Sequence, residues 1–183
     1  LGGYGLAKFR FPGRKAVFVV IIGAISVPGI ALAVPQFLLF AKLNLTNTPW
    51  AMIIPSLVST FGLYLMWIFS EQAVPTELLE AARVDGAGEL RTFFQVSLPL
   101  LAPGIVTTAL FSIVATWNNY FLPALVIDSA NKKTVPILIA QLRSADFLKF
   151  DMGKVYMMVF LAILPVIIIY LLLSKFIVRG VAL

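Results

Sequence analysis

Most acidic side chains of this sequence lie in one stretch, residues 71–103, which reads EQAVPTELLEAARVDGAGELRTFFQVSLPLLAP. Five of the eight acidic residues fall there, namely Glu71, Glu77, Glu80, Asp85 and Glu89. The stretch also contains a cluster of small residues, Ala81, Ala82, Gly86, Ala87 and Gly88. Exposed carboxylates can pair with basic side chains of another protein, and small residues let that protein approach closely. The chemistry that this stretch offers is recognition of a partner.

A second group of polar side chains follows a helical spacing farther along the chain. Thr108, Ser112, Thr116 and Asn119 are four, four and three residues apart, which places them on one face of a helix. Hydroxyl and amide groups on such a face can line an aqueous path, and Trp117 and Tyr120 nearby can stack on a ring. Ser and Thr are equally common where membrane helices pack closely. Both interpretations, a path and a packing face, follow from the pattern.

Several kinds of chemistry are excluded by missing residue types. The sequence contains neither Cys nor His, which removes thiol catalysis and the commonest metal ligand and general base. The pattern G-x-x-x-x-G-K-[ST], which cradles phosphates, is also missing. We therefore expect no catalytic residues, no metal site and no cofactor. If ATP drives this protein, another chain must hydrolyse it.

The composition places the chain in a lipid bilayer. Hydrophobic residues make up 61% of the 183 residues, charged residues only 12%, and the mean hydropathy is +1.00. Soluble domains are about half apolar and about a quarter charged. The net charge of +6 comes from basic residues scattered among the apolar segments, so we expect no nucleic-acid binding.

Four segments are long and apolar enough to cross a bilayer as helices. They are residues 16–40, 50–69, 104–127 and 155–176. Pro28 and Pro35 should kink the first. No segment has an ionisable residue near its middle, which weighs against a proton- or ion-coupled carrier. The sequence thus predicts an all-α, polytopic membrane helical bundle.

The basic residues before the first span indicate the orientation. Lys8, Arg10, Arg14 and Lys15 have no acidic residue among them, so this end should be cytoplasmic. Residues 71–103 are then cytoplasmic, and residues 41–49 and 128–154 are external. The longer external loop carries Asp128, Lys132, Lys133, Arg143, Asp146, Lys149, Asp151 and Lys154. Its charges suit either a docking surface or an ordinary solvated loop.

The acidic stretch itself predicts two short helices. The first begins at Pro75 or Thr76 and ends at an Asp85-Gly86 turn. The second begins near Gly88 and ends at Pro99 and Pro103. Its apolar face should comprise Leu90, Phe93, Phe94, Ser97 and Leu98. Such a hairpin can dock a partner or lie on the membrane surface.

The segment EAARVDGAGELRTFFQVSLPLLAP resembles the EAA loop of the membrane-spanning subunits of ABC importers. The similarity lies in Glu80-Ala81-Ala82, Asp85-Gly86-Ala87, Phe94 and Leu98-Pro99. YGLAKFRFPGRK, TWNNYFLPALV and FIVRGVAL resemble the carbohydrate-uptake branch, which includes the maltose-transporter permeases. Gly88 departs from that pattern, in which Ser is frequent.

The resemblance implies a type I permease domain over residues 1–183, truncated at its N-terminus, with the coupling element at 71–103. Such a subunit usually has six spans, and the first two are expected to be missing. Its coupling residues would be Glu80, Ala81, Ala82, Asp85, Gly86 and Ala87.

The resemblance also implies partners and a location. The implied partners are cytoplasmic ATPase subunits, a second permease, an extracytoplasmic solute-binding protein and a sugar substrate. The location is the cytoplasmic membrane of a prokaryote. Permeases for glycerol phosphate, a polyol or an amino acid are alternatives, as is a carrier or scaffold without an ATPase.

Overall fold

The described part of the chain is helical. The computed structural model describes residues 1–144 and 151–181, with side chains described through Ser174, and these residues include no strand. The predicted all-α class is therefore confirmed. Asp146 and Lys149, which the sequence assigns to an external loop, lie outside the described residues.

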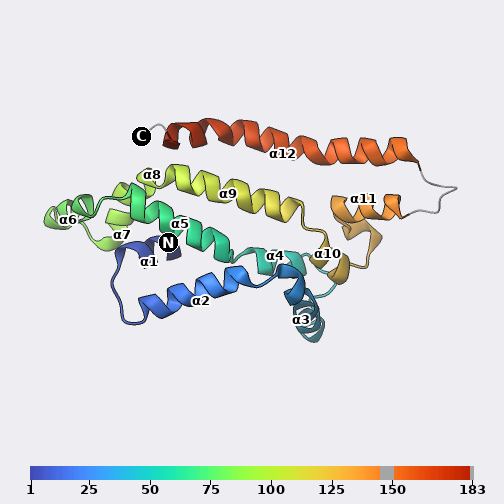
Figure 1. The fold of residues 1–183 in the computed structure, drawn as a ribbon, viewed down its shortest axis with the longest axis horizontal. Coiled ribbons are helices and arrows are strands. Elements are labelled where there is room, and N and C mark those ends of the chain that lie inside the picture. Colours follow the sequence, from blue (N-terminus) through green and yellow to red (C-terminus); the bar gives the residue numbers. More distant parts are fainter. Residues whose placement is uncertain (145–150, 182–183) are drawn as a thin grey trace. The chain divides into compact units, whose positions relative to one another are not determined.

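The chain forms two compact units, one of residues 1–26, 59–112 and 172–183 and one of residues 27–58 and 113–171. The first unit contains α1 (Gly2–Lys8), α2 (Arg14–Ser26), α5 (Thr60–Ala73), α6 (Thr76–Val84), α7 (Glu89–Thr92), the π-helix η1 (Phe93–Ser97) and α8 (Leu98–Leu100). The second contains α3 (Gly29–Lys42), α4 (Trp50–Ser56), α10 (Phe121–Val126), the 3₁₀-helix η2 (Ala130–Lys132) and α11 (Val135–Arg143). Two helices, α9 (Ala102–Trp117) and α12 (Met152–Val181), continue from one unit into the other (Figure 1).

The first unit is built on close contact between α1 and α5 (Figure 1). A Cβ atom at Gly3 would lie 2.7 Å from the backbone nitrogen of Trp67, so only glycine permits this approach. Ser59 caps α5 by accepting a hydrogen bond from the Gly62 backbone N–H at 3.0 Å. The buried core of this unit comprises Tyr4, Val74, Leu79, Phe93 and Leu101. It packs Tyr4 of α1 against residues of the acidic stretch.

The second unit has its own small core around α3, α4 and α10. Phe40, Ala51, Val126 and Ile127 are buried there together. The backbone N–H of Asn47, in the loop between α3 and α4, donates to the carbonyl of Val126 at 2.6 Å. This loop is thereby attached directly to the end of α10.

The described residues contain two helices that are long and apolar enough to span a membrane, or up to four if each bent pair counts as one span. The two candidates outside the bent pairs are Trp50–Ala73, which comprises α4 and α5, and Met152–Ser174. They match the second and fourth predicted spans. The first predicted span is divided into α2 and α3 at Val27 and Pro28, so the break at Pro28 is confirmed. Pro35 lies inside α3.

The third predicted span, residues 104–127, is wrong as a single helix. α9 ends at Trp117, and the chain resumes a helix only at Phe121. Pro123 supplies the reason, because it has no N–H to donate to the carbonyl of Asn119 and its ring would clash with that carbonyl. Asn118 and Asn119 accordingly lie outside the helices, at this break.

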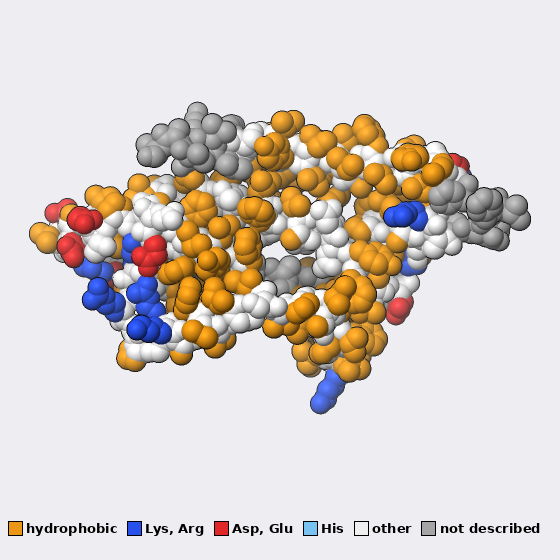
Figure 2. Space-filling view, in the orientation of Figure 1, with side chains coloured by type: hydrophobic (Ala, Val, Ile, Leu, Met, Phe, Trp, Pro, Cys, Tyr) orange, Lys and Arg blue, Asp and Glu red, His pale blue; other side chains and the backbone are white. Residues whose placement is uncertain are grey.

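The sides of the helices expose apolar surface, as spans in lipid do. Within Met152–Ser174, the apolar window has a mean hydropathy of 2.8 and 0% of it is buried inside the structure. Figure 2 shows orange hydrophobic side chains over much of the molecular surface, with red and blue side chains gathered at the end of the first unit that carries α6. A surface of this kind requires a bilayer or other membrane helices around it.

Candidate functional site

Residues 76–100 form a helical hairpin with a sharp bend, as the acidic stretch predicts. α6 ends at Val84 with Asp85 as its C-cap, and Gly86 has the left-handed φ of 79°. The Ala87 N–H donates to the Ala82 carbonyl at 2.9 Å, and the Gly86 N–H donates to the Arg83 carbonyl at 3.0 Å. These two bonds define a Schellman motif, which glycine favours because it lacks a Cβ atom. The predicted Asp-Gly turn is confirmed.

An ion pair that the sequence analysis missed closes the bend. Arg83 Nε lies 2.8 Å from Glu89 Oε1, and Arg83 Nη2 lies 3.3 Å from Glu89 Oε2. The hydrogen bond and charge of Glu89 raise the pKa of Arg83. The pair links the end of α6 to the start of α7, two positions six residues apart across a turn. No helical spacing rule identifies such a pair.

The tip of the hairpin is open to solvent. Among the six residues at the sequence-predicted coupling site, Glu80, Ala81, Asp85 and Gly86 are exposed, whereas Ala82 and Ala87 are half-buried. Beside them Val84 is 87% exposed. Leu79 is only 2% exposed and attaches the hairpin to the core of the first unit. The hairpin thus has one anchored side and one free side of mixed polarity.

The predicted single apolar face of the second hairpin helix is wrong. Phe93 and Ser97 are buried and Leu98 is half-buried, but Leu90 and Phe94 are 71% and 56% exposed. Residues 93–97 form a π-helix, which has more residues per turn than an α-helix and therefore shifts the side chains away from α-helical register. The apolar residues consequently divide between the core and the free surface.

The end of this helix also differs from the prediction. The helical backbone passes through Pro99, because Pro99 stands in the first turn of α8, where its missing N–H is tolerated. The helix ends after Leu100. The chain then bends by 74° into α9, in which Pro103 occupies the first turn.

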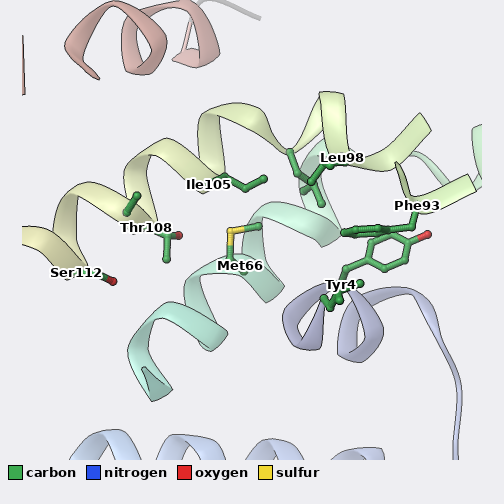
Figure 3. A pocket seen from close by; sticks show the side chains of 10 residues that line it. Tyr4, Met66, Phe93, Leu98, Ile105, Thr108 and Ser112 are labelled. Atoms are coloured by element: carbon green, nitrogen blue, oxygen red, sulfur yellow. The ribbon is translucent and has the colours of Figure 1, made fainter. Parts of the chain in front are cut away.

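A cavity of about 300 Å³ lies behind the hairpin within the first unit. Figure 3 shows Thr108 and Ser112 on α9 at one end of it, and Tyr4 and Phe93 at the other. The Thr108 hydroxyl is buried and has no hydrogen-bond partner among the described residues. Two of the four predicted pathway residues therefore line one cavity, with a polar and an aromatic end.

The other two predicted pathway residues are elsewhere. Thr116 is exposed on the last turn of α9, and Asn119 is exposed in the break that follows this helix. The Asn119 N–H donates to the Thr116 carbonyl at 3.2 Å, which is the tightened end of the helix. The expectation of four residues on one continuous helical face is wrong at Asn119, because α9 ends at Trp117.

Trp117 and Tyr120 line a different cavity, of about 640 Å³, in the second unit. Asn118 and Arg143 contribute polar groups to its lining. The Trp117 indole N–H donates to the Ala162 carbonyl at 2.9 Å, which joins the end of α9 to α12. Stacking of Trp117 and Tyr120 on a sugar ring stays a prediction.

Comparison with known proteins places the chain among transport proteins. It matches the family described as "Binding-protein-dependent transport system inner membrane component" over residues 1–182. It is 33% identical over 180 residues to the lactose transport system permease protein LacG of Rhizobium radiobacter, an alignment covering 98% of this chain and 65% of the relative.

Two further similarities agree. The chain is 33% identical over 181 residues to the arabinooligosaccharides transport system permease protein AraQ of Bacillus subtilis, covering 97% of this chain and 62% of the relative. It also shares its fold with a chain of a bacterial ABC transporter involved in the import of the acidic polysaccharide alginate. That match has a TM-score of 0.78 and 24% identity and covers 95% of this chain and 65% of the other.

The chain spans less than two thirds of the length of these two relatives. The family match nevertheless extends over nearly all of the sequence. That match shows that the chain belongs to the family of binding-protein-dependent transport system inner membrane components.

Proposed function

We propose that this protein is the permease subunit of an ATP-driven importer that moves a sugar or oligosaccharide across the membrane. The observation that carries the proposal is the hairpin with an anchored side and an exposed tip, in a chain of this family. The names of the relatives, a lactose permease and an arabinooligosaccharide permease, support the substrate class. ATP hydrolysis is assigned to a separate subunit, because the sequence has no phosphate-cradling loop.

The hairpin is proposed as the site where this ATPase subunit binds. Glu80, Ala81, Ala82, Asp85, Gly86 and Ala87 would be the coupling residues. The exposed carboxylates can pair with basic residues of the ATPase, and the exposed Val84 offers an apolar contact beside them. The buried Leu79 supports this role, since a force applied to the tip would reach the core.

The substrate path is proposed to run past the polar positions of α9. Thr108 and Ser112 line a cavity, and Thr116 and Asn119 are exposed farther along the chain. Hydroxyl and amide groups suit hydrogen bonding to a neutral, hydroxyl-rich substrate. The unpartnered Thr108 hydroxyl supports this assignment, because a buried polar group without a partner is costly in the absence of a ligand or water.

The proposed setting is the cytoplasmic membrane of a prokaryote, crossed several times, with residues 71–103 on the cytoplasmic side. Residues 1–183 would form one permease domain. A second permease and an extracytoplasmic solute-binding protein would complete the importer. The loops at residues 41–49 and 128–154 would then face outside, toward the binding protein.

Charge reversal in the hairpin tests the coupling role. In the importer reconstituted in liposomes, Glu80→Lys should lower ATP-dependent sugar uptake at least about tenfold, the loss expected from removing about 1.4 kcal/mol of coupling. Glu77→Lys is the matched control, because it makes the same charge change at an exposed position of α6 that is not one of the six proposed coupling residues. Unchanged uptake in Glu80→Lys, or failure of the wild-type protein to co-purify with an ATPase, would refute the proposal.

A further inference from the structure

Tyr4 lies on α1 and packs against the second helix of the hairpin in the core of the first unit. Its side chain is only 4% exposed and belongs to the core cluster of the first unit. Its ring lies against that of Phe93, with centroids 4.9 Å apart, as Figure 3 shows. The Ser97 hydroxyl donates a hydrogen bond to the Tyr4 hydroxyl at 3.2 Å. One tyrosine therefore contacts two positions of the second hairpin helix.

These two positions are the first and the last residue of the π-helix. Residues 93–97 form this segment, and Tyr4 stacks on one end and accepts a hydrogen bond from the other. Short π-helices are rare and occur frequently at functional sites. Ser97 is fully buried, so its hydroxyl would lose a partner if Tyr4 moved away. Tyr4 thus contacts both ends of the π-helical segment.

The helix that carries Tyr4 is in turn fixed to α5. At Gly3 the α1 backbone approaches the α5 backbone so closely that a Cβ atom would lie 2.8 Å from the carbonyl carbon of Met66. Near the C-terminal end of α5, Arg14 Nη2 pairs with Glu71 Oε1 at 2.8 Å and also donates to the Ala7 carbonyl at 3.2 Å. A displacement of α1 therefore has to move α5 as well.

Space for such a movement is available beside Tyr4. The cavity of about 300 Å³ lies beside Tyr4, Phe93 and Leu98. Leu101 also lines it, whereas Val74 and Leu79 of the same cluster are buried and do not. Packed interiors do not deform continuously, so a shift of Phe93 would be directed toward the cavity.

We infer that Tyr4 is a positioning residue that transmits movement of the hairpin to α5 through the π-helix. This inference rests on the proposed function, because it assumes that an ATPase moves the hairpin. It goes beyond that function by assigning a role to a residue outside the acidic stretch. A structural role alone would require only the Tyr4 ring, whereas transmission also requires its hydrogen bond to Ser97.

The test is the ratio of sugar imported to ATP hydrolysed, measured on the complete importer in liposomes. Tyr4→Phe keeps the ring and removes the hydroxyl. We expect ATP hydrolysis within about twofold of wild type and an import ratio lowered about fivefold, at the low end of measured couplings between sites. Ser97→Ala removes the other partner and should give the same loss, and the double variant should lose no more than either single one.

Tyr64→Phe is the matched control, since it removes a hydroxyl from a half-buried tyrosine of α5 that stacks on Phe18 and Trp67. It should leave the import ratio unchanged. A wild-type ratio in Ser97→Ala, or hydrolysis and import that fall in parallel, would overturn the inference. If Tyr4→Phe fails to assemble, Ser97→Ala decides alone. A wild-type complex without sugar-stimulated ATP hydrolysis would instead refute the proposed function.

Discussion

Asn47 and Ser129 exchange two hydrogen bonds across 82 residues of sequence. Asn47 Nδ2 donates to Ser129 Oγ at 2.7 Å, and the Ser129 N–H donates to Asn47 Oδ1 at 3.1 Å. Lys132 Nζ also donates to the Asn47 carbonyl at 2.6 Å. Asn47 has a left-handed φ of 57°, which asparagine tolerates better than most residues. This residue therefore holds together two loops that we propose to face the outside of the cell.

Removing the Asn47 side chain should lower the stability of the second unit. Asn47→Ala loses the side-chain bonds and adds left-handed strain, costing about 1–3 kcal/mol for the bonds and about 1–2 kcal/mol for the strain. Asn47→Gly loses the bonds alone, so its inactivation temperature in detergent should lie between those of wild type and Asn47→Ala. Equal inactivation temperatures for all three proteins would contradict this reading of Asn47.

The bend of the hairpin should depend on Gly86 and not on Gly88. An alanine at Gly86 meets no neighbour but must keep a φ of 79°, so Gly86→Ala should cost about 1–2 kcal/mol by strain alone. Gly88 also has open space around it, and its φ of −67° suits any residue. We expect Gly86→Ala to weaken binding of the ATPase up to about tenfold, measured by titration of the purified subunit.

Gly88→Ala is the matched control for that titration and should bind the ATPase as the wild type does. If both alanine variants bind like wild type, the left-handed bend does not matter for docking. If Gly88→Ala is the weaker binder, the contact surface lies on the other side of the bend.

Close packing of α9 on α5 should be sensitive at Gly104. A Cβ atom there would lie 2.5 Å from Cγ and 2.8 Å from Cβ of Phe69, the stem of a side chain that cannot turn away. Gly104→Ala should therefore destabilise the protein by about 1–3 kcal/mol, seen as a lower inactivation temperature. Gly23→Ala, in an open position of α2, should raise that temperature slightly or leave it unchanged. Similar behaviour of the two variants would show that the α5–α9 contact is looser.

Features encoded by local chemistry could be predicted from the sequence. Asp85-Gly86 specifies its own turn through the left-handed φ of glycine, and the break between α2 and α3 falls at Val27 and Pro28. The apolar composition of residues 104–127 predicts one helix, but it takes no account of Pro123, which has no N–H to donate to the carbonyl of Asn119. A proline alone does not fix where a helix ends, because Pro35 lies inside α3 without breaking it.

Features that depend on distant contacts could not be predicted. The π-helix at residues 93–97 is associated with Tyr4, about 90 residues away in sequence, and no period in the sequence marks it. Phe94, which lies within that segment, is 56% exposed. Asn47 likewise has no local signal, because its partners Ser129 and Lys132 belong to another loop.

Photo-crosslinking from the tip of the hairpin tests the central claim most directly. Benzoylphenylalanine placed at Val84, which is 87% exposed, should form a covalent adduct with the ATPase subunit in the assembled importer. The same group at Leu57, which is 73% exposed within the second predicted span, should form none. An ATPase adduct from Val84 alone is the predicted result. No adduct from Val84, or equal adducts from both positions, would contradict the assignment of the hairpin as the ATPase-binding element.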